Sequence, residues 1–367
     1  MEKFDDPLTL FLIAARKQQK SKRYIDEWLP IVEKQISNHI PLILTPYTLS
    51  LLSGVSLDYL YTASNQTLSK HYKTFSIPKR NGGKRKISAP LPTLKIFQSW
   101  VYKNILVNIP ISPFAKAFRS SYSLKDNTRF HRMQSLVLKL DIKNFFPSLR
   151  AQLVNSFFLN LGYPPSVATI LTNLLTLKGG LPQGAPSSPA LSNILMFNFD
   201  NCLSKYCLEL GIRYTRYADD LTFSGDSFSV REVIGQVSLL LSQLNLKLNR
   251  KKIRVLKKGQ KQIVTGLLVN NAKVVVPRKY RRDLRLEAYH FLSDHSEAHL
   301  KKTLGHKALP IEKVKYCQKL LGKANFVLQI DSSNNEFRYT QRQLINYLQI
   351  LMTDLPNHQN MFEKGEM

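Results

Sequence analysis

Two adjacent aspartates between short apolar runs constrain the fold of this chain more than any other feature. Residues 214–225 read YTRYADDLTFSG, with Asp219 and Asp220 at the centre. Neighbouring residues of a strand point to opposite faces, so both aspartates can serve one site only at a tight turn between two strands. We therefore expect a β-hairpin with both carboxylates at its tip. So much negative charge is costly unless a cation offsets it, and a hard divalent ion suits carboxylate ligands.

A third carboxylate, Asp141, stands at the end of the apolar run 136–141, upstream of the pair. Three carboxylates from two strands can hold two Mg²⁺ ions for an in-line displacement at phosphorus. The alternative for Asp219 and Asp220 is an ordinary turn, because aspartate is common at turns. The presence of Asp141 favours the metal site.

Three segments, taken in chain order, resemble the palm motifs of reverse transcriptases. Residues 140–146 resemble the first motif, and residues 217–220, YADD, resemble the catalytic box. Between them, residues 181–189 read LPQGAPSSP and resemble the bacterial form of the intervening motif. The resemblance extends over residues 70–275.

This resemblance implies an α+β fold of the right-hand polymerase type, with fingers, palm and thumb and an antiparallel palm sheet. It implies that Asp141, Asp219 and Asp220 are catalytic and, with Ile142, form the site for two Mg²⁺ ions. We expect a helical extension at 1–69, fingers and palm at 70–275, a helical RNA-binding thumb at 276–355 and a tail at 356–367.

The charge of the chain indicates a polyanionic partner. The 53 Lys and Arg residues against 25 Asp and Glu give a formal net charge of +28. Such an excess points to nucleic acid, although a membrane surface or a solvated basic coat would also account for it. We expect no membrane partner, because no apolar run approaches the length that spans a bilayer. Three cysteines and a start unlike a signal peptide favour the cytoplasm.

Residues 75–90 are predicted to form a basic β-hairpin. The segment 81–83, Asn-Gly-Gly, supplies residues that tolerate positive φ at a turn. Around it, residues 59–125 contain twelve Lys and Arg and no acid. The hairpin resembles the fingers hairpin of reverse transcriptases, in which Lys79 and Arg85 would contact the triphosphate of a dNTP. The alternative is a solvated basic hairpin.

Three further residues are substrate-binding candidates by resemblance. Phe146 would exclude a ribose 2′-OH by steric contact, since a packed ring has no room to yield, although it could instead be a core residue. Gln183 would contact template or incoming nucleotide, within a Pro- and Gly-rich turn. Lys252 would protonate or stabilise the departing pyrophosphate, the alternative being a basic patch that faces phosphate. Ser187 or Ser188 is expected to cap a helix over 190–210.

Two short signatures resemble those of retron reverse transcriptases. Residues 127–131, NTRFH, match the retron pattern Asn-Ala-x-x-His in part, because Thr128 replaces alanine. Residues 264–266 match the retron Val-Thr-Gly in full. In addition, residues 247–285 hold fourteen Lys and Arg against one acid, a density that suits a phosphate-binding groove. The RNA-binding candidates are Asn127, His131, Val264, Thr265, Gly266, Arg278, Arg281 and Arg282.

The resemblance as a whole implies a retron reverse transcriptase. Such an enzyme starts DNA synthesis at a guanosine 2′-OH of its structured non-coding RNA and produces branched RNA–DNA, called msDNA, in antiphage defence. The partners would be that RNA, the msDNA, dNTPs and a separate effector protein. The alternatives are an abortive-infection type enzyme that makes protein-primed or untemplated DNA, a group II intron enzyme, or a catalytically idle RNA-binding scaffold. Three mutually repelling carboxylates argue against the scaffold.

Overall fold

The computed structural model describes residues 6–65, 68–78, 82–120 and 122–353. The chain forms two compact units, which we describe separately. Unit 1 comprises residues 1–127 and 135–256, and unit 2 comprises residues 128–134 and 257–367. The division after residue 256 precedes the expected thumb boundary at 276, and the short segment 128–134 belongs to unit 2. The assignment of these parts to fingers, palm and thumb is a proposal.

Unit 1 begins with four helices, as the sequence predicts. They are α1 (Pro7–Lys17), α2 (Lys22–Ser37), α3 (Pro46–Ser53) and α4 (Leu57–Asn65). The side chains of Ser21 and Thr45 cap α2 and α3 by accepting backbone N–H groups. The buried amide of Gln35 bonds to Ile43 and to the carbonyl of Gly162, which ties these helices to the rest of the unit.

The predicted basic hairpin is confirmed. Strands β1 (Tyr72–Pro78) and β2 (Lys84–Pro90) pair in antiparallel register, from Tyr72 with Pro90 to Pro78 with Lys84. Gly82 and Gly83 have φ of 80° and 76°, as a turn residue without Cβ allows. The rest of the turn, including Lys79, lies outside the described residues. Helix α5 (Pro92–Asn104) follows β2 directly.

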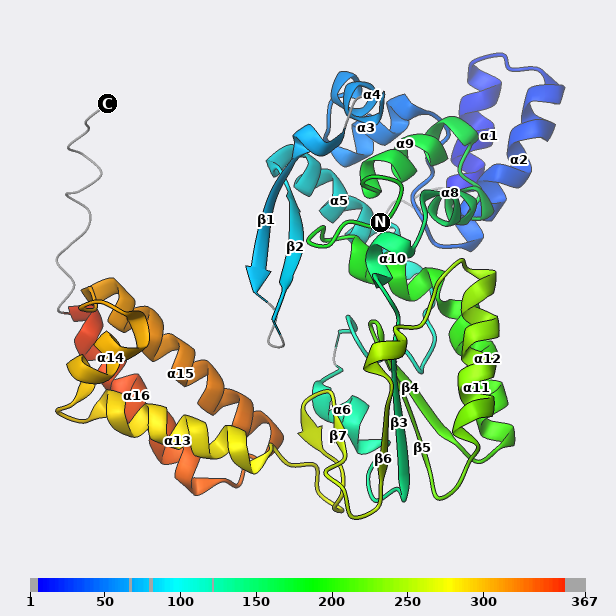
Figure 1. Ribbon diagram of the computed structural model, residues 1–367. Coiled ribbons are helices and arrows are strands. Elements are labelled where there is room, and N and C mark those ends of the chain that lie inside the picture. The colour runs from blue at the N-terminus through cyan, green and yellow to red at the C-terminus, as the bar shows by residue number, and fades with distance from the viewer. Residues whose placement is uncertain (1–5, 66–67, 79–81, 121, 354–367) are drawn as a thin grey trace. The chain divides into compact units, whose positions relative to one another are not determined.

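Unit 1 contains a four-stranded sheet at the end away from α1–α4 (Figure 1). Its strands are β3 (Leu136–Asp141), β4 (Arg213–Tyr217), β5 (Asp220–Gly225) and β6 (Arg254–Lys257), in the order β4-β5-β3-β6. Strand β5 pairs antiparallel with both β3 and β4, as expected of a polymerase palm. Buried Leu138, Leu221 and Phe223 give this sheet an apolar face. Two helices, α11 (Phe197–Glu209) and α12 (Val230–Gln243), lie along the sheet (Figure 1).

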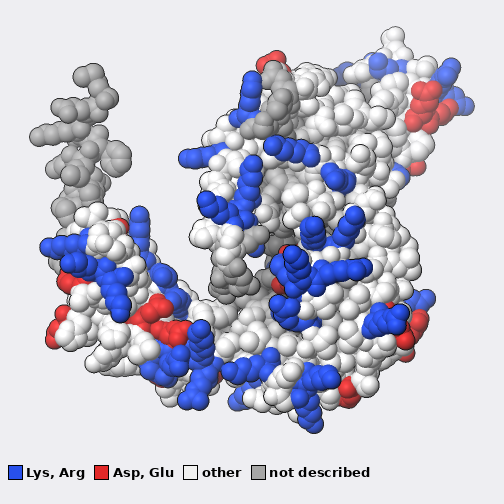
Figure 2. Space-filling view, viewed as in Figure 1, with Lys and Arg blue, Asp and Glu red and all other residues white. Residues whose placement is uncertain are grey.

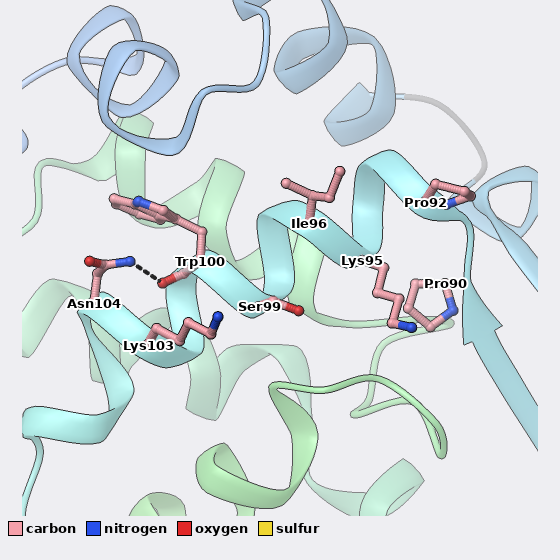
Figure 3. A pocket seen from close by; sticks show the side chains of 8 residues that line it. All are labelled: Pro90, Pro92, Lys95, Ile96, Ser99, Trp100, Lys103 and Asn104. Carbon is pink, nitrogen blue, oxygen red and sulfur yellow. Dashed lines mark hydrogen bonds between the residues drawn. The ribbon is translucent and has the colours of Figure 1, made fainter.

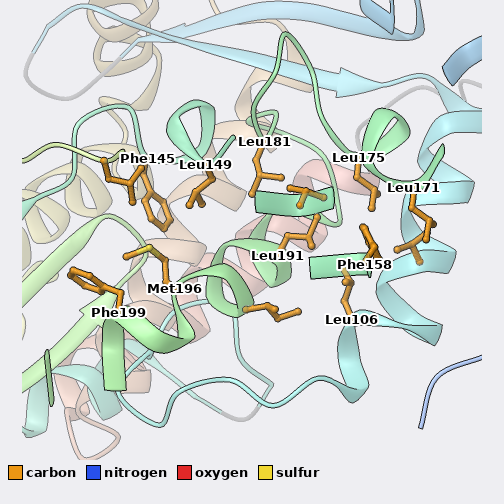
Figure 4. Close-up of a cluster of buried hydrophobic side chains, with 14 of the residues drawn as sticks. Leu106, Phe145, Leu149, Phe158, Leu171, Leu175, Leu181, Leu191, Met196 and Phe199 are labelled. Atoms are coloured by element: carbon orange, nitrogen blue, oxygen red, sulfur yellow. The ribbon is translucent and has the colours of Figure 1, made fainter. Parts of the chain in front are cut away.

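The helices of unit 1 after β3 are α7 (Phe145–Ser148), α8 (Ala151–Asn160), α9 (Pro165–Leu175), α10 (Ser188–Leu195), α11 (Phe197–Glu209) and α12 (Val230–Gln243). Their buried side chains form one hydrophobic core with the sheet (Figure 4). The prediction of a single helix over 190–210 was wrong, because the helix is interrupted at Met196. Ser187 does precede α10, but neither its hydroxyl nor that of Ser188 makes a capping bond.

Unit 2 is a small hairpin followed by helices, in agreement with the predicted helical C-terminal part. Its elements are β7 (Ile263–Val264), β8 (Leu267–Leu268), α13 (Arg278–Leu292), α14 (Ser296–Leu304), α15 (Pro310–Ile330) and α16 (Asn335–Thr353). Phe291, Leu320 and Phe337 are buried between the helices. Ion pairs join Glu287 to Lys323 and Arg285 to Glu336. Across the described residues, none of the helices is both long and apolar enough to cross a membrane.

Candidate active site

The two adjacent aspartates lie at the turn between β4 and β5, as their spacing predicts. Tyr217 pairs with Asp220, so Ala218 and Asp219 form the turn itself and Asp220 is the first residue of β5. Ala218 has φ of 57°, a left-handed conformation that is uncommon for a residue with a Cβ. This turn releases Asp219 from the alternation of the strand, so both carboxylates can serve one site.

Asp141 lies beside this turn. It is the last residue of β3 and the register partner of Asp220. The backbone N–H of the next residue, Ile142, donates to the carbonyl of Asp219 at 2.9 Å. The pairing of β3 with β5 therefore brings the three predicted aspartates, and Ile142, to the same end of the sheet.

The electrostatics of the cluster oppose its full ionisation. Burial raises the pKa of Asp219 to about 6, and the charges of Asp220 and Asp141 contribute to the rise. Burial also raises the pKa of Asp220, while Lys139 and Lys252 lower it in part. The charges of Lys139 and Lys252 thus offset the carboxylates only in part, and a bound cation would offset them further.

Lys252 and Asn249 hold the side chain of Asp141. Lys252 Nζ donates to Asp141 Oδ1 at 2.5 Å, and Asn249 Nδ2 donates to Oδ2 at 3.1 Å. Burial lowers the pKa of Lys252, but the bond to Asp141 and the nearby carboxylate charges outweigh this effect and raise it overall. The side chain of Lys252 remains 58% exposed, so it can exchange this bond for another anion.

The donor set suits a divalent metal ion. Three carboxylates and a backbone carbonyl are hard oxygen ligands of the kind that Mg²⁺ binds. Within the part of the chain that the structure describes, no three His, Cys, Asp or Glu side chains form a closed metal-binding cluster. At this site, Lys252 and Asn249 donate hydrogen bonds to the two oxygens of Asp141. Each carboxylate oxygen has two lone pairs, so one hydrogen bond on each still leaves a position for a metal ion.

Similarity to known proteins shows the family of this chain. Residues 77–292 match the family described as reverse transcriptase (RNA-dependent DNA polymerase). The Retron Ec86 reverse transcriptase of Escherichia coli is 31% identical over 318 residues, which cover 84% of this chain and 90% of that protein. This chain belongs to the retron-type reverse transcriptases.

Other relatives match over a shorter length. The Retron Mx65 reverse transcriptase of Myxococcus xanthus is 35% identical over 258 residues, or 65% of this chain and 59% of that protein. Among solved structures, the telomerase from Candida albicans in complex with a fragment of telomeric RNA has a TM-score of 0.41 at 11% identity, over 80% of this chain and 65% of that one. As a reverse transcriptase, the chain is an RNA-directed DNA polymerase, and enzymes of this family generally use divalent metal ions.

The substrate-binding candidates of this reverse transcriptase, apart from Lys79, lie on connected segments of unit 1. Phe146, on α7, is half-buried and contacts the rings of Phe145 and Phe118 at centroid distances of 5.3 and 6.1 Å. Its carbonyl accepts from the N–H of Leu181, at the start of the segment 181–189. Two residues later the carbonyl of Gln183 accepts from Ser88 on β2, the strand that also carries exposed Arg85.

This connection requires glycine at position 184. Gly184 has φ of 123°, and an added Cβ would lie 2.8 Å from the carbonyl oxygen of Ser88 and 2.9 Å from Ile87 Cγ2. Both the backbone conformation and the close approach of β2 exclude a side chain. Gly184 thus has a physical role in joining the hairpin to the active-site region.

Two of the RNA-binding candidates are inaccessible. Asn127 and His131 have no exposed surface, although both lie in or next to helix α6 (Leu124–Arg129). Neither side chain can touch RNA in this conformation. Any contribution to RNA binding would come from how they hold the exposed residues around them, such as Arg129 and Phe130.

The Val-Thr-Gly segment forms the tip of the hairpin between β7 and β8. Val264 is buried and pairs with Leu267, while Thr265 and Gly266 form the turn with φ of 44° and 91°. A turn with two positive φ values favours Asn-Gly, and a β-branched residue there is an outlier. Such an outlier is consistent with a functional constraint on the tip.

The arginine candidates lie on one face of α13. Arg278, Arg281, Arg282 and Arg285 follow the spacing of successive helical turns and line a cavity of about 250 Å³. The Nε of Arg281 is buried without a hydrogen-bond partner. On the face shown in Figure 2, Lys and Arg side chains outnumber Asp and Glu. The α13 face therefore suits phosphate groups.

A larger open groove, of about 720 Å³, lies along α5 (Figure 3). Lys95, Trp100 and Lys103 line it, together with Pro90 and Pro92. None of the three aspartates contributes to it. This groove is thus separate from the candidate site for chemistry.

One contributor to the site was missed by the sequence analysis. Asn249 fixes Asp141 through both its side chain and its backbone N–H, which donates to the Asp141 carbonyl at 2.7 Å. Asn249 lies three residues before Lys252, within the basic segment 245–253. A small polar residue so close to the candidate lysine is the sequence feature that could have indicated its role.

Proposed function

We propose that this reverse transcriptase starts DNA synthesis at a guanosine 2′-OH of a partner RNA and produces the branched RNA–DNA called msDNA. The observation that carries the proposal is the match to a retron enzyme over 90% of that enzyme's length. The Val-Thr-Gly tip supports it as a second retron feature. A 2′-OH must be held in one pose for attack. Such positioning can lower the activation barrier by up to about 7–11 kcal/mol.

In the proposed mechanism, Asp141, Asp219 and Asp220, with the backbone of Ile142, hold two Mg²⁺ ions. When bound, such ions activate the attacking oxygen and stabilise charge at phosphorus. Lys252 leaves Asp141 and donates a proton to the departing pyrophosphate, which its exposed side chain allows. Arg85 and Lys79 would contact the triphosphate, and Gln183 would contact the template or the nucleotide.

The partners in this proposal are a cognate structured RNA, its msDNA, dNTPs and a separate effector protein, in cytoplasmic antiphage defence. The charge of +28 supports the nucleic-acid partners. Arg278, Arg281 and Arg282 would bind phosphates of the RNA, together with the hairpin tip at 264–266. Asn127 and His131 would support the RNA-binding surface from within.

Binding of the RNA should depend steeply on salt, and the α13 arginines should account for part of this dependence. Arg281→Glu with Arg282→Glu should lower the slope of log affinity against log salt by about 1.4–1.8, because each lost phosphate contact removes roughly 0.7–0.9. The measurement is a titration of labelled RNA at several salt concentrations. The matched control is Lys20→Glu with Arg23→Glu, an equal charge change at exposed positions near α2. Equal slopes in both variants would contradict the α13 assignment.

The priming proposal is tested by the nature of the product in cells. The gene should be expressed with its upstream DNA, and small nucleic acids should then be isolated. We expect single-stranded DNA of discrete length that keeps a ribonucleotide branch after ribonuclease treatment and loses it to debranching enzyme. DNA attached to protein, or long untemplated DNA, would contradict the proposal and favour the abortive-infection type.

A further inference from the structure

A buried ion pair lies directly behind the catalytic turn. Arg216 on β4 and Asp200 on α11 both have fully buried side chains, at 0% exposure. Arg216 donates from Nε to Asp200 Oδ1 at 2.8 Å and from Nη2 to Oδ2 at 2.6 Å. The hydroxyl of Tyr214 donates to Asp200 Oδ1 at 2.8 Å. Two parallel hydrogen bonds, Nε to Oδ1 and Nη2 to Oδ2, therefore fix the guanidinium against the carboxylate.

Stability alone is a weak reason for such a pair. Removing two charges from water costs about as much as their attraction returns, and apolar side chains of similar size often stabilise a fold equally well. In some proteins such a pair fixes one conformation instead. The third nitrogen of Arg216 indicates which conformation this is.

Arg216 Nη1 donates to the carbonyl oxygen of Ala218 at 3.3 Å. That carbonyl belongs to the peptide group that joins Ala218 to Asp219, so the bond limits rotation of the backbone immediately before Asp219. Ala218 has φ of 57°, a conformation that costs free energy for any residue with a Cβ. A strained conformation persists only where its surroundings over-determine it.

The backbone of Arg216 is also fixed on its other side. Its N–H donates to the carbonyl of Phe114 at 2.9 Å, and its carbonyl accepts from the N–H of Lys116 at 2.8 Å. The guanidinium is therefore held by Asp200, and the backbone by the segment 114–116. Because both parts of Arg216 are held, the position of Nη1 beside the Ala218 carbonyl is also fixed.

We propose that Arg216, held by Asp200, is a positioning residue that keeps Ala218 in its left-handed conformation and thereby aims the Asp219 carboxylate. This inference rests on the proposed catalytic role of Asp219. Arg216 touches neither substrate nor metal in this account. Its effect reaches the reaction through the Ala218–Asp219 peptide group.

The first variant is Arg216→Lys, which keeps the charge but has one nitrogen and cannot bind Asp200 twice while reaching Ala218. We expect kcat for dNTP addition on a primed RNA template to fall by about 10- to 100-fold, the cost of a small misplacement of a reacting group. KM for dNTP and RNA affinity should change little. Tyr214→Phe is the matched control, because it removes one bond to Asp200 but leaves Arg216 in place, so kcat should remain near that of the wild type.

Rescue by glycine separates positioning from a merely structural role. Glycine adopts positive φ without a penalty, so Ala218→Gly should restore a large part of kcat in the Arg216→Lys background. A second background, Asp200→Asn with Arg216→Gln, replaces the buried charges with neutral amides, and Gln is too short to reach Ala218. The same rescue is expected there.

Two results would overturn the inference. One is a folded Arg216→Lys or double-amide variant whose low kcat is unchanged by Ala218→Gly. The other is failure of both backgrounds to fold at temperatures where the wild type is folded, since the pair would then serve the fold and not the turn. Failure of the catalytic proposal is distinguishable from both, because an active Asp219→Asn variant would reveal it independently of any change at Arg216.

Discussion

Replacing Asp219 and Asp220 with asparagine should abolish dNTP incorporation on a primed RNA template. Both residues lie at the β4–β5 turn beside Asp141, and asparagine keeps the shape but not the negative charge that holds a divalent cation. Losing the several kcal/mol of charge stabilisation that bound metals supply corresponds to a fall of about 10³-fold or more in rate. The measurement is single-turnover extension of a labelled primer with magnesium.

The controls for this variant separate chemistry from folding. RNA affinity should remain near that of the wild type, because asparagine removes no cation from the chain. Without divalent ions the double variant should unfold at a higher temperature than the wild type, since it no longer buries two repelling carboxylates. Asp226→Asn, at an exposed position just after β5, is the matched control and should retain full activity. Full activity of the double variant would disprove the assignment.

Replacing Phe146 with alanine should raise the incorporation of rNTPs relative to dNTPs. The ring lies on α7, close after Asp141, and is held against Phe145 and Phe118. A packed ring excludes a 2′-OH because it cannot move aside, and its removal would relax discrimination by about 10- to 100-fold. The measurement is the ratio of kcat/KM for one rNTP and its matching dNTP.

The conservative variant Phe146→Tyr provides the control, because it keeps the ring and should keep the wild-type ratio. An unchanged ratio in Phe146→Ala, with the protein still folded, would show that Phe146 is only a core residue. An equal loss of activity with rNTP and dNTP would indicate that Phe146 supports the packing of α7. The ratio of the two kcat/KM values would still measure discrimination between the sugars.

The candidate site could be predicted from the sequence because its signals are local. Adjacent aspartates between β-prone runs demand a turn, and the structure places Ala218 and Asp219 there. The apolar run that ends in Asp141 forms the neighbouring strand, which a short apolar segment also predicts. The basic hairpin at 72–90 follows from its Gly-containing turn.

What the sequence did not reveal depends on contacts between distant segments. The break at Met196 has no glycine or proline to mark it, so the helix over 190–210 was predicted as one. The burial of Asn127 and His131 could not be deduced from a polar pattern. Nor could the partner of Arg216 be identified, because Asp200 belongs to another element, although a charged residue within a buried strand indicates that some partner exists.

The central claim is that the first deoxynucleotide is joined to a 2′-oxygen of the partner RNA. Its most direct test uses the purified protein, magnesium, labelled dNTP and two versions of that RNA, synthesised with guanosine or with 2′-deoxyguanosine at the branch position mapped in cells. Both RNAs should carry a blocked 3′ end. We predict that label joins only the RNA with the 2′-OH. Equal labelling of the 2′-deoxy RNA, or label attached to the protein, would contradict the claim.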